Sequence, residues 1–424
     1  MQESVLHFIW KHQYYNISKS VLDSGDSVIV LAQGISNLNA GPDFGQAKLK
    51  IKNVEWNGDV EIHIKSSDWN AHKHQFDKAY NKVILHVVWE KDKEVMREDG
   101  TFLPTLELNK LVDKKLLVKV DSLINSIATI SCASQLELVS EITIIDTIQK
   151  ALVKRLQRKA QVVIKELDYA KGDWEEVAYR QYMRQMGMKV NGDTFYDLAL
   201  LLPYKLIRKY SHSLKSIEAL LFGASGLLHS AKEDAYIKEL KKEYEHLAVK
   251  HGLNRKLNPA QWKFLRLRPS NFPTLRIAQV ASLLSSSTSL FKLFTEFLMA
   301  EELFQRLGIK SSRYWQSHYR FSAEAKNKVP VFGKTSADLV LLNVVAPLLA
   351  AYSLHVDGQK YIERAVKLAE HLKPEQNRIL KEWKAVGIKA KSGAESQALI
   401  ELYNEHCKNK SCLTCGIGFS IINN

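Results

Sequence analysis

The chain has 424 residues, of which 46% are hydrophobic and 25% are charged. This composition is typical of a globular protein and excludes collagen-like and disordered chains, and the length suffices for two or three domains. The formal net charge of +14 and the pI of about 9.3 favour a polyanionic partner, so we expect the protein to bind nucleic acid.

The apolar segments predict no membrane span and no signal peptide. The most apolar run, residues 339–354, is shorter than the roughly 20 residues of a membrane helix and contains Asn343 and Pro347. The apolar part of the N-terminus carries Glu3 and His7, which is not typical of a signal peptide. We therefore expect a cytoplasmic protein that makes no contact with membranes. The sequence does not indicate any protein partner.

The first part of the chain predicts a helix followed by strands. Residues 4–13 read as a helix, whereas four later segments are rich in β-branched residues and alternate with a period of two. The predicted strands cover residues 26–34, 47–52, 58–65 and 83–90, and a second helix is predicted at residues 72–81. The predicted order is helix, three strands, helix, strand.

From about residue 135 the pattern becomes helical, with helix-start signals such as Asp173 followed by Glu176. We therefore predict an α+β protein with an N-terminal mixed α/β domain, a large all-helical region and a cysteine-bearing C-terminal tail. The predicted boundaries are 1–107 for the α/β domain, 108–134 for a connecting segment, 135–404 for the helical domain and 405–424 for the tail.

One predicted strand, residues 58–65, carries ionisable side chains on a single face, because successive side chains of a strand point to opposite sides. The residues of this face are Asp59, Glu61, His63 and Lys65. Asp43 begins a neighbouring strand, and two carboxylates on adjacent strands can bind a hard cation such as Mg²⁺ or Mn²⁺. Such an ion activates water and neutralises charge on a phosphate. The ordinary alternative is a solvated strand face.

The segments PDF, with Asp43, and EIH, with Glu61 and His63, resemble the motif of the PD-(D/E)xK (restriction-endonuclease-like) nuclease superfamily. The core of that superfamily has the order helix, three strands, helix, strand, which matches the predicted order. The resemblance implies that Asp43 and Glu61 are catalytic metal ligands and that Glu3 adds an acid from the first helix. His63 stands where the motif has its lysine, and Lys65 on the same face is the candidate replacement.

Nearly the whole chain also resembles an uncharacterised bacterial family, mainly from Bacteroidetes, that is classified only as a domain of unknown function. The segments that carry this resemblance are IWK near the start, NAGPDF, GDVEIH, SDWNAHKH, AYNKVILHVV and the terminal CLTCGIG. This resemblance implies no function.

Four histidines within 24 residues suggest a second type of metal centre. They are His63, His72, His74 and His86, and they lie near Asp68 and Asp77. Such a set can bind a transition metal, although its spacing matches no zinc motif. The ordinary alternative is that some are surface histidines and that His86, between apolar neighbours, is simply packed in the core.

Three of the four cysteines lie close together in the spacing Cys-x4-Cys-x2-Cys. The cysteines are Cys132, Cys407, Cys412 and Cys415. In a cytosolic protein such a cluster more often binds a metal than forms disulfides. The set can supply the thiolates of a 4Fe–4S cluster, whereas three cysteines with His406 can form a zinc site. Reduced thiols without a metal are the alternative.

Basic side chains of the helical region are candidate contacts for nucleic-acid phosphates, because they lie on segments with aromatic residues nearby. They are Arg155, Arg158, Lys159, Arg266 and Arg268. A solvated helix face is the alternative explanation.

These features predict a metal-dependent nuclease that cleaves DNA or RNA. One alternative is a catalytically inactive nucleic-acid-binding or scaffold protein with a nuclease-like fold, which the missing motif lysine favours. Another is a histidine-based metallohydrolase that acts on a different substrate. The chain lacks a complete P-loop, a Rossmann glycine fingerprint and an HExxH motif, so an ATPase and a dinucleotide-dependent oxidoreductase are not expected.

Overall fold

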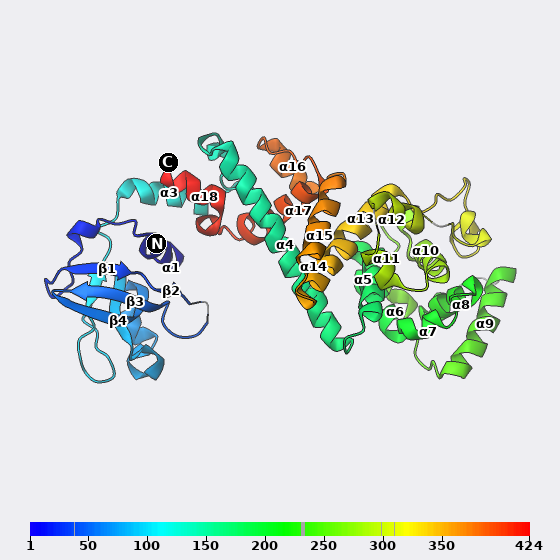
Figure 1. Cartoon of the computed structure of the whole chain (residues 1–424), viewed down its shortest axis with the longest axis horizontal. Helices are drawn as coiled ribbons and strands as arrows, with labels where there is room; N and C mark the ends of the chain where they lie inside the picture. Colours follow the sequence, from blue (N-terminus) through cyan, green and yellow to red (C-terminus); the bar gives the residue numbers. More distant parts are fainter. Residues whose placement is uncertain (38, 230–233, 298, 309) are drawn as a thin grey trace. The chain divides into compact units, whose positions relative to one another are not determined.

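The computed structural model describes residues 1–37, 39–229, 234–297, 299–308 and 310–424 (Figure 1). The chain forms two compact units. Unit 1 contains Met1–Thr147 and Leu402–Asn424, and unit 2 contains Ile148–Glu401. The chain therefore leaves unit 1 once and returns to it near the C-terminus.

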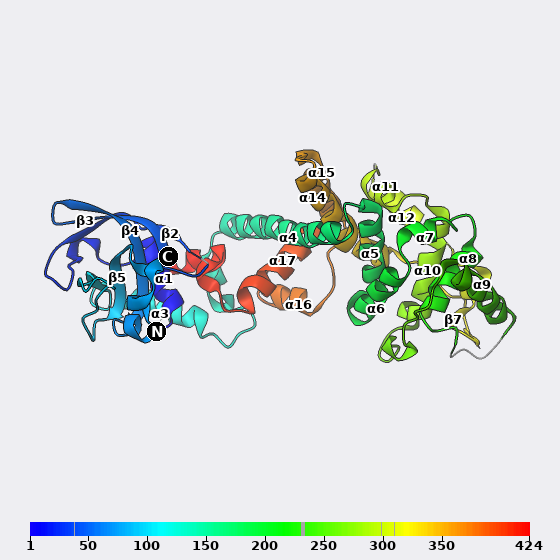
Figure 2. The same ribbon diagram turned by 90° about the horizontal axis from the view of Figure 1, so that it is seen from below.

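Unit 1 is built on a mixed sheet in the order β1-β3-β4-β5-β6, and β2 pairs with the first two residues of β3. The strands are β1 (Val28–Ala32), β2 (Ile35–Ser36), β3 (Phe44–Ile51), β4 (Val54–Lys65), β5 (Val83–Glu90) and β6 (Thr105–Glu107). The pairs β1–β3 and β3–β4 are antiparallel, whereas β4–β5 and β5–β6 are parallel. Figure 2 shows β4 and β5 beside each other in the turned view.

Helix α1 (Glu3–His12) packs against β4. Its apolar residues are spaced so that one side of the helix is buried, which is the expected behaviour of an amphipathic helix. The buried residues are Val5, Leu6, Phe8, Ile9 and Trp10. Helix α3 (Lys114–Ile124) and the 3-10 turn η4 (Ala133–Leu138) follow the sheet in the chain. The predicted first helix and the positions of the main strands agree with these elements.

The prediction of a single helix at residues 72–81 is wrong. This segment contains the end of the short helix α2 (Asp68–Ala71) and two 3-10 turns, η2 (His74–Phe76) and η3 (Lys78–Tyr80). Lys73 has a positive φ of 64°, which interrupts helical geometry, and the Asp77 carboxylate accepts a hydrogen bond from the Ala79 N–H to start the second turn.

The C-terminal segment completes unit 1. It contains the π-helical turn η9 (Tyr403–Cys407), the 3-10 turn η10 (Cys412–Thr414) and helix α18 (Gly416–Asn423). Helix α18 packs against α3 and η4, and Phe419 on α18 makes an edge contact with Phe8 on α1.

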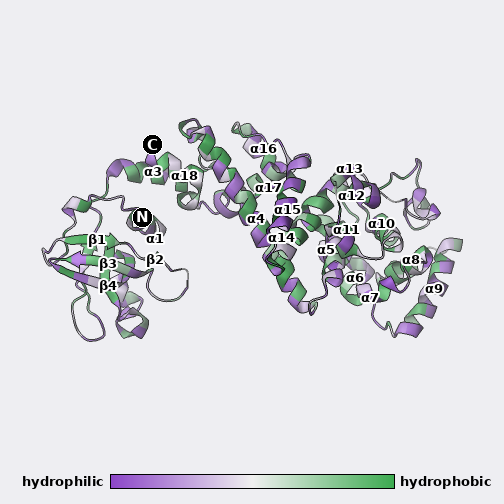
Figure 3. Ribbon diagram, in the orientation of Figure 1, coloured by the Kyte–Doolittle hydropathy of each residue, from purple (hydrophilic) through white to green (hydrophobic). Residues whose placement is uncertain are grey.

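Among its described residues, unit 2 is helical apart from one small hairpin. Its helices are α4 (Glu141–Tyr169, which begins in unit 1), α5 (Trp174–Met186), α6 (Met188–Leu201), α7 (Tyr204–Arg208), α8 (Leu214–Ala224), α9 (Ala235–His251), α10 (Pro273–Ser286), α11 (Leu290–Thr295), α12 (Ala300–Leu307), α13 (Lys334–Val340), α14 (Ala346–His355), α15 (Gln359–His371), α16 (Arg378–Ala385) and α17 (Gly393–Leu402). The hairpin consists of β7 (His318–Arg320) and β8 (Ala323–Glu324). In Figure 3 many of these helices carry both hydrophilic and hydrophobic colours, as amphipathic helices do.

One continuous helical stretch, Lys334–His355, is long and apolar enough to cross a membrane by length and composition alone. However, 72% of its most apolar window is buried within the protein, and a core helix passes the same test. The observed architecture, a mixed N-terminal sheet with a large helical region, confirms the predicted α+β class.

Candidate functional site

Strand β4 and the residue that precedes β3 bring two carboxyl groups together. Phe44 on β3 pairs with Val60 on β4, so Asp43 lies beside Glu61. The Asp43 backbone N–H donates to Glu61 Oε2 over 3.1 Å, and the Ile62 N–H donates to Asp43 Oδ2 over 3.0 Å. The antiparallel pairing thus unites the two acids that the sequence singles out.

The polar face of β4 is buried at its centre. Glu61 is 5% exposed and His63 is 1% exposed, whereas Lys65 at the end of the strand is exposed. Asp59 is partly exposed, and its Oδ1 accepts a hydrogen bond from the Gln46 N–H over 3.1 Å. Because buried ionisable groups need partners, Glu61 and His63 are the members of this face that call for an explanation.

Glu61 lies in a low-polarity environment close to two imidazoles. Burial, and then the neighbouring Asp43 carboxylate, raise the pKa of Glu61 to about 8. Its Oε1 lies 3.5 Å from His63 Nε2 and 3.5 Å from His74 Nε2. A carboxyl group with such a pKa is largely protonated at neutral pH, and a bound divalent cation would favour its ionised form.

His63 is held between two other histidines. Its Nδ1 lies 2.8 Å from His86 Nε2, and its Nε2 lies 3.1 Å from His72 Nδ1. Burial, and then the nearby His74 and His72, lower the pKa of His63 to about 4, and burial also lowers the pKa of His86. Both rings are therefore neutral near pH 7, which is the form that binds metals. When His63 Nδ1 donates to His86, its Nε2 lone pair faces the Glu61 side.

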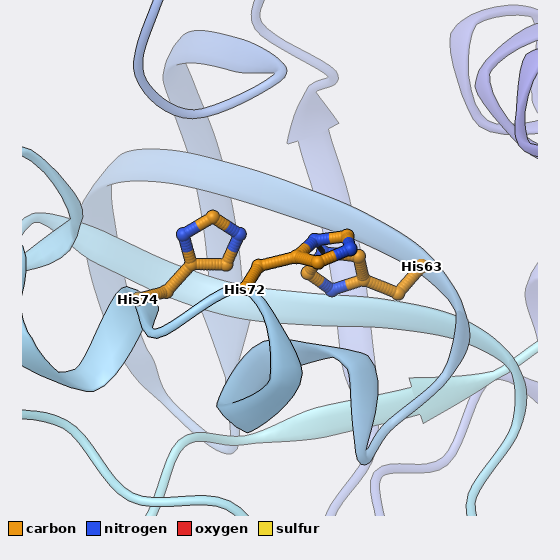
Figure 4. Close-up of side chains that lie close together, drawn as sticks. All are labelled: His63, His72 and His74. Carbon is orange, nitrogen blue, oxygen red and sulfur yellow. Dashed lines mark hydrogen bonds between the residues drawn. The ribbon is translucent and has the colours of Figure 1, made fainter.

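The segment after β4 places His72 and His74 against His63 (Figure 4). The ring centroids lie 5.0 Å apart for His63 and His72, 5.3 Å for His63 and His74, and 5.4 Å for His72 and His74. The His74 ring stacks on Tyr80 with a centroid distance of 3.8 Å. His74 Nε2 is buried and makes no hydrogen bond with the described residues.

Some of the distances between these donor atoms are similar to those between the ligands of a metal ion. Tetrahedral sites with metal–ligand bonds of about 2.0–2.1 Å separate their ligand atoms by about 3.3–3.4 Å. Three separations come close to this value: 3.5 Å from Glu61 Oε1 to His63 Nε2, 3.5 Å from Glu61 Oε1 to His74 Nε2, and 3.1 Å from His63 Nε2 to His72 Nδ1. One donor nitrogen from each of the three histidines lies within 4.8 Å of the others. We call Glu61, His63, His72 and His74 the histidine–carboxylate centre.

Helix α1 adds two ionisable groups beside Asp43. His7 Nε2 lies 3.3 Å from Asp43 Oδ2. Partial burial, and then the Asp43 charge, raise the pKa of Glu3. Glu3 is a predicted site residue, but His7 is absent from the prediction. The spacing of Glu3 and His7, four residues apart on one helix face, is the signal that points to His7.

A groove of about 760 Å³ lies between α1 and the C-terminal segment 409–419, and it reaches His7. Its aromatic and basic lining residues include Phe8, Lys11, His12, Phe44 and Phe419. Phe8 and Phe44 are buried, so the groove brings the half-buried Phe419 and the exposed Lys11 and His12 to the neighbourhood of Asp43.

The other acids near the histidines accept hydrogen bonds from backbone N–H groups. Asp68 Oδ2 accepts a hydrogen bond from the Lys65 N–H over 2.9 Å, and Asp77 Oδ1 accepts one from the Ala79 N–H over 2.9 Å. His86, which the sequence presents as a packed core residue, is fully buried and also contacts His63.

The four cysteines all lie in unit 1. Cys132, Cys407 and Cys412 are buried free thiols, and Cys415 is partly exposed. Burial, and then the thiols of Cys415 and Cys412, raise the pKa of Cys132 to about 12. The fold therefore brings the distant Cys132 near the C-terminal cysteines.

Three of the predicted nucleic-acid contacts are engaged inside unit 2. Arg155 and Arg158 both donate to Glu401, over 3.0 and 2.6 Å, and Lys159 Nζ donates to Asn343 Oδ1 over 2.7 Å. The two remaining candidates, Arg266 and Arg268, are exposed. A role of these five residues in nucleic-acid binding stays a prediction.

Comparison with known proteins identifies a family. The sequence model described as "Protein of unknown function (DUF2851)" matches residues 3–378, which is nearly the whole chain. The expected resemblance to an uncharacterised family is thereby confirmed. No curated protein and no solved structure matches the chain. The nuclease superfamily is not shown by these comparisons, and that resemblance stays an inference from the motif residues.

Proposed function

We propose that this chain, which belongs to the family of proteins of unknown function DUF2851, is a metal-dependent hydrolase that cleaves phosphodiester bonds in nucleic acid. One observation carries the proposal. Buried Glu61 Oε1 lies 3.5 Å from both His63 Nε2 and His74 Nε2, while Asp43 is hydrogen-bonded alongside. A buried carboxyl group with convergent imidazoles and a second acid is a typical setting for metal-assisted hydrolysis.

The donor set favours a transition metal at this centre. Imidazole nitrogens suit Mn²⁺, Zn²⁺ and related ions, whereas Mg²⁺ prefers oxygen ligands and retains several waters. The sequence-based prediction of Mg²⁺ or Mn²⁺ at Asp43 and Glu61 stays open. Mn²⁺ accepts both nitrogen and oxygen ligands, so we take it as the first ion to test.

The chain's own groups have separate roles in this proposal. Glu61, His63, His72 and His74 would hold the ion. An ion with six coordination positions, such as Mn²⁺, keeps further positions at which it would supply an activated water and neutralise phosphate charge. Asp43 acts as the proton acceptor, because its carboxylate lies beside Glu61 and is oriented by the Ile62 N–H. His7, 3.3 Å from Asp43 and on the groove, is the group through which that proton passes to solvent.

Several features support nucleic acid as the substrate. The net charge of +14 attracts a polyanion. The groove that reaches His7 carries the half-buried Phe419, on which a base can stack, and the exposed Lys11 for a phosphate. The order α1, three main strands, short helical turns and β5 agrees with the order expected from the resemblance to PD-(D/E)xK nucleases.

The test is a cleavage assay with the full-length protein, first stripped of metal and then supplied with Mn²⁺, Mg²⁺ or Zn²⁺. The substrates are labelled single- and double-stranded DNA and RNA. Asp43→Asn and Glu61→Gln remove charge with little change in shape. His212→Ala, on an exposed histidine of unit 2, is the matched control.

We expect Mn²⁺-dependent cleavage that both carboxyl substitutions reduce by about 100-fold or more, because even outer partners of metal sites contribute about 10–100-fold. The control should retain full activity. Binding of nucleic acid without cleavage would favour the inactive binding or scaffold protein. Cleavage that survives both substitutions would contradict the proposal.

A second candidate is a metallohydrolase that acts on a different substrate. The three clustered imidazoles favour it, because the PD-(D/E)xK motif does not call for them. Hydrolysis of a small phosphate ester or amide that depends on His72 and His74, in the absence of any nuclease activity, would identify this alternative.

A further inference from the structure

The four cysteines come from two distant parts of the chain and lie at turns rather than inside regular helices. Cys132 immediately precedes η4, and Cys407 is the last residue of η9. Cys412 begins η10, and Cys415 immediately precedes α18. Turns of this kind let several side chains of a short segment point toward one position, as they do at metal-binding knuckles.

Hydrogen bonds fasten the tail to the chain around Cys132. Lys410 Nζ donates to Ser126 O over 2.7 Å, to Ala128 O over 2.9 Å and to Ser131 Oγ over 3.0 Å. Ser131 also hydrogen-bonds the Cys412 side chain. Ser131, the residue before Cys132, thus contacts both Cys412 and Lys410.

Close packing at two glycines also fixes the position of the C-terminal segment. A Cβ atom on Gly416 would lie 2.4 Å from Thr147 Oγ1, and one on Gly418 would lie 2.2 Å from the Cys412 carbonyl oxygen. Only glycine allows these approaches. The positions of Cys412 and Cys415 are therefore set by the backbone and do not depend on side-chain rotamers alone.

Three of the four thiols are buried, and within the described part of the chain no three of the four sulfur atoms lie within 4.8 Å of one another. Burial, and then Cys132, Cys415 and Cys412, raise the pKa of Cys407 above its ordinary value. Burial is also the largest cause of the raised pKa of Cys412, whereas the positive charge of Lys410 lowers this pKa by favouring the thiolate.

We propose that Cys132, Cys407, Cys412 and Cys415 bind one metal centre through four thiolates, and that this centre fixes the C-terminal segment to the α/β unit. Four cysteines including a Cys-x2-Cys pair can bind a zinc ion or a 4Fe–4S cluster. Zinc would require the sulfur atoms to approach to about 3.8 Å, closer than they lie here, so the spacing favours the larger cluster. The positive charge of Lys410 next to the site offsets part of the negative charge of a four-thiolate complex. The inference stands on these residues and is independent of the proposed hydrolase activity.

The centre would also support one wall of the groove beside α1. Lys410, Leu413, Thr414 and Cys415 line that groove, so the residues that hold the metal and the residues that face the groove belong to the same turns. A metal here has a structural role, because four cysteine ligands leave no open position for substrate at a zinc ion.

The experiment measures the metal content of full-length protein purified without oxygen, by elemental analysis and by absorption spectroscopy. The variants are Cys132→Ser, Cys412→Ser and the double variant His63→Ala/His74→Ala. We expect about one zinc or about four irons per chain in the histidine variant, with visible absorption in the iron case, and in the wild type the same metal in addition to any ion at the histidine–carboxylate centre. Each cysteine variant should lose this metal. Equal metal content in the wild type and Cys132→Ser, or no metal in either, would overturn the proposal.

A second measurement does not require a folded cysteine variant. X-ray absorption at the zinc or iron edge of the His63→Ala/His74→Ala protein reports the atoms bound to the remaining metal. A first shell of sulfur, at about 2.3 Å for zinc, is the expected result. A shell of nitrogen and oxygen would place the metal elsewhere and would overturn the proposal.

Discussion

At the scale of single residues, the feature that needs an explanation is the burial of Glu61. Its side chain lies against His63 and His74, and the pKa of each of these imidazoles is lowered by burial. Without a cation the Glu61 carboxyl group is largely protonated at neutral pH, whereas a bound divalent cation would favour the carboxylate and would use the imidazole lone pairs as ligands. The metal ion that we propose would give the burial of Glu61 and the neutrality of its histidine neighbours a common explanation.

His86 contacts the histidine–carboxylate centre from outside and supports it. His86 Nε2 lies 2.8 Å from His63 Nδ1 and fixes the orientation of the His63 ring. We expect His86→Phe to weaken Mn²⁺ affinity by about 10–100-fold, as is usual for the outer partners of metal ligands. His86→Gln, which keeps a hydrogen-bond acceptor, should lose less. Titration calorimetry measures both, and equal affinity in the wild type and His86→Phe would refute the supporting role.

At the scale of elements, irregularities in the sheet adjust the site. The β3–β4 register shifts between Phe44 and Ala47, where Gln46 has a positive φ of 61° and its N–H meets Asp59. The β4–β5 register shifts between Asp59 and Val60. Bulges bend a strand and re-aim its side chains. Both shifts directly flank the residues that carry the carboxyl groups.

Gly58 permits the close approach of β4 to β5. A Cβ atom at this position would lie 2.5 Å from Ile84 Cγ2 and 2.5 Å from the Lys82 carbonyl oxygen. Gly58→Ala should therefore lower the free energy of unfolding of unit 1 by about 1–3 kcal/mol, the usual range for overpacking. Gly333→Ala, where a Cβ would meet no atom within 4 Å, is the matched control. Chemical denaturation compares the two, and an equal effect would contradict the steric argument.

Helix α4 contains a lysine whose protonation opposes folding. Burial, and then Arg155, lower the pKa of Lys159 to about 7, with Arg158, Glu375 and Glu401 also nearby. Between about pH 7 and the model-peptide pKa near 10.4, the unfolded chain binds the extra proton, so the stability of unit 2 should rise with pH in this window. The increase is at most about 1.4 kcal/mol per pH unit.

Lys159→Met should flatten that pH dependence of stability, measured by denaturant unfolding at pH 7 and pH 9.5. Lys154→Met, on an exposed lysine of the same helix, is the control and should retain the slope. A slope that persists in Lys159→Met would show that another group titrates in this range.

At the scale of the whole molecule, the chain builds unit 1 from both of its ends, and unit 2 lies between them in sequence. Local sequence patterns predict the strand that carries the site and the side chains that share its face. The alternation along β4 predicted that Glu61 and His63 share a face, and the strand order predicted that Asp43 would join them. Both depend only on the period of a strand and on the pairing of neighbours.

These local patterns do not predict packing between distant parts of the chain. Nothing local reveals that the C-terminal segment returns to α1 and forms a groove with it, or that Arg155 is buried against Glu401. The irregular segment at residues 72–81 was misread as a helix because its polar composition fits either structure. Its turns are what bring His72 and His74 to His63.

The most direct test of the histidine–carboxylate centre is the binding of Mn²⁺ to metal-free full-length protein, followed by pulsed electron paramagnetic resonance. The account predicts one tightly bound ion with couplings to histidine nitrogen, and an affinity that falls by about 100-fold or more in Glu61→Gln and in His74→Ala but not in His212→Ala. Binding that is unchanged in Glu61→Gln and His74→Ala, or a bound ion without nitrogen couplings, would contradict it.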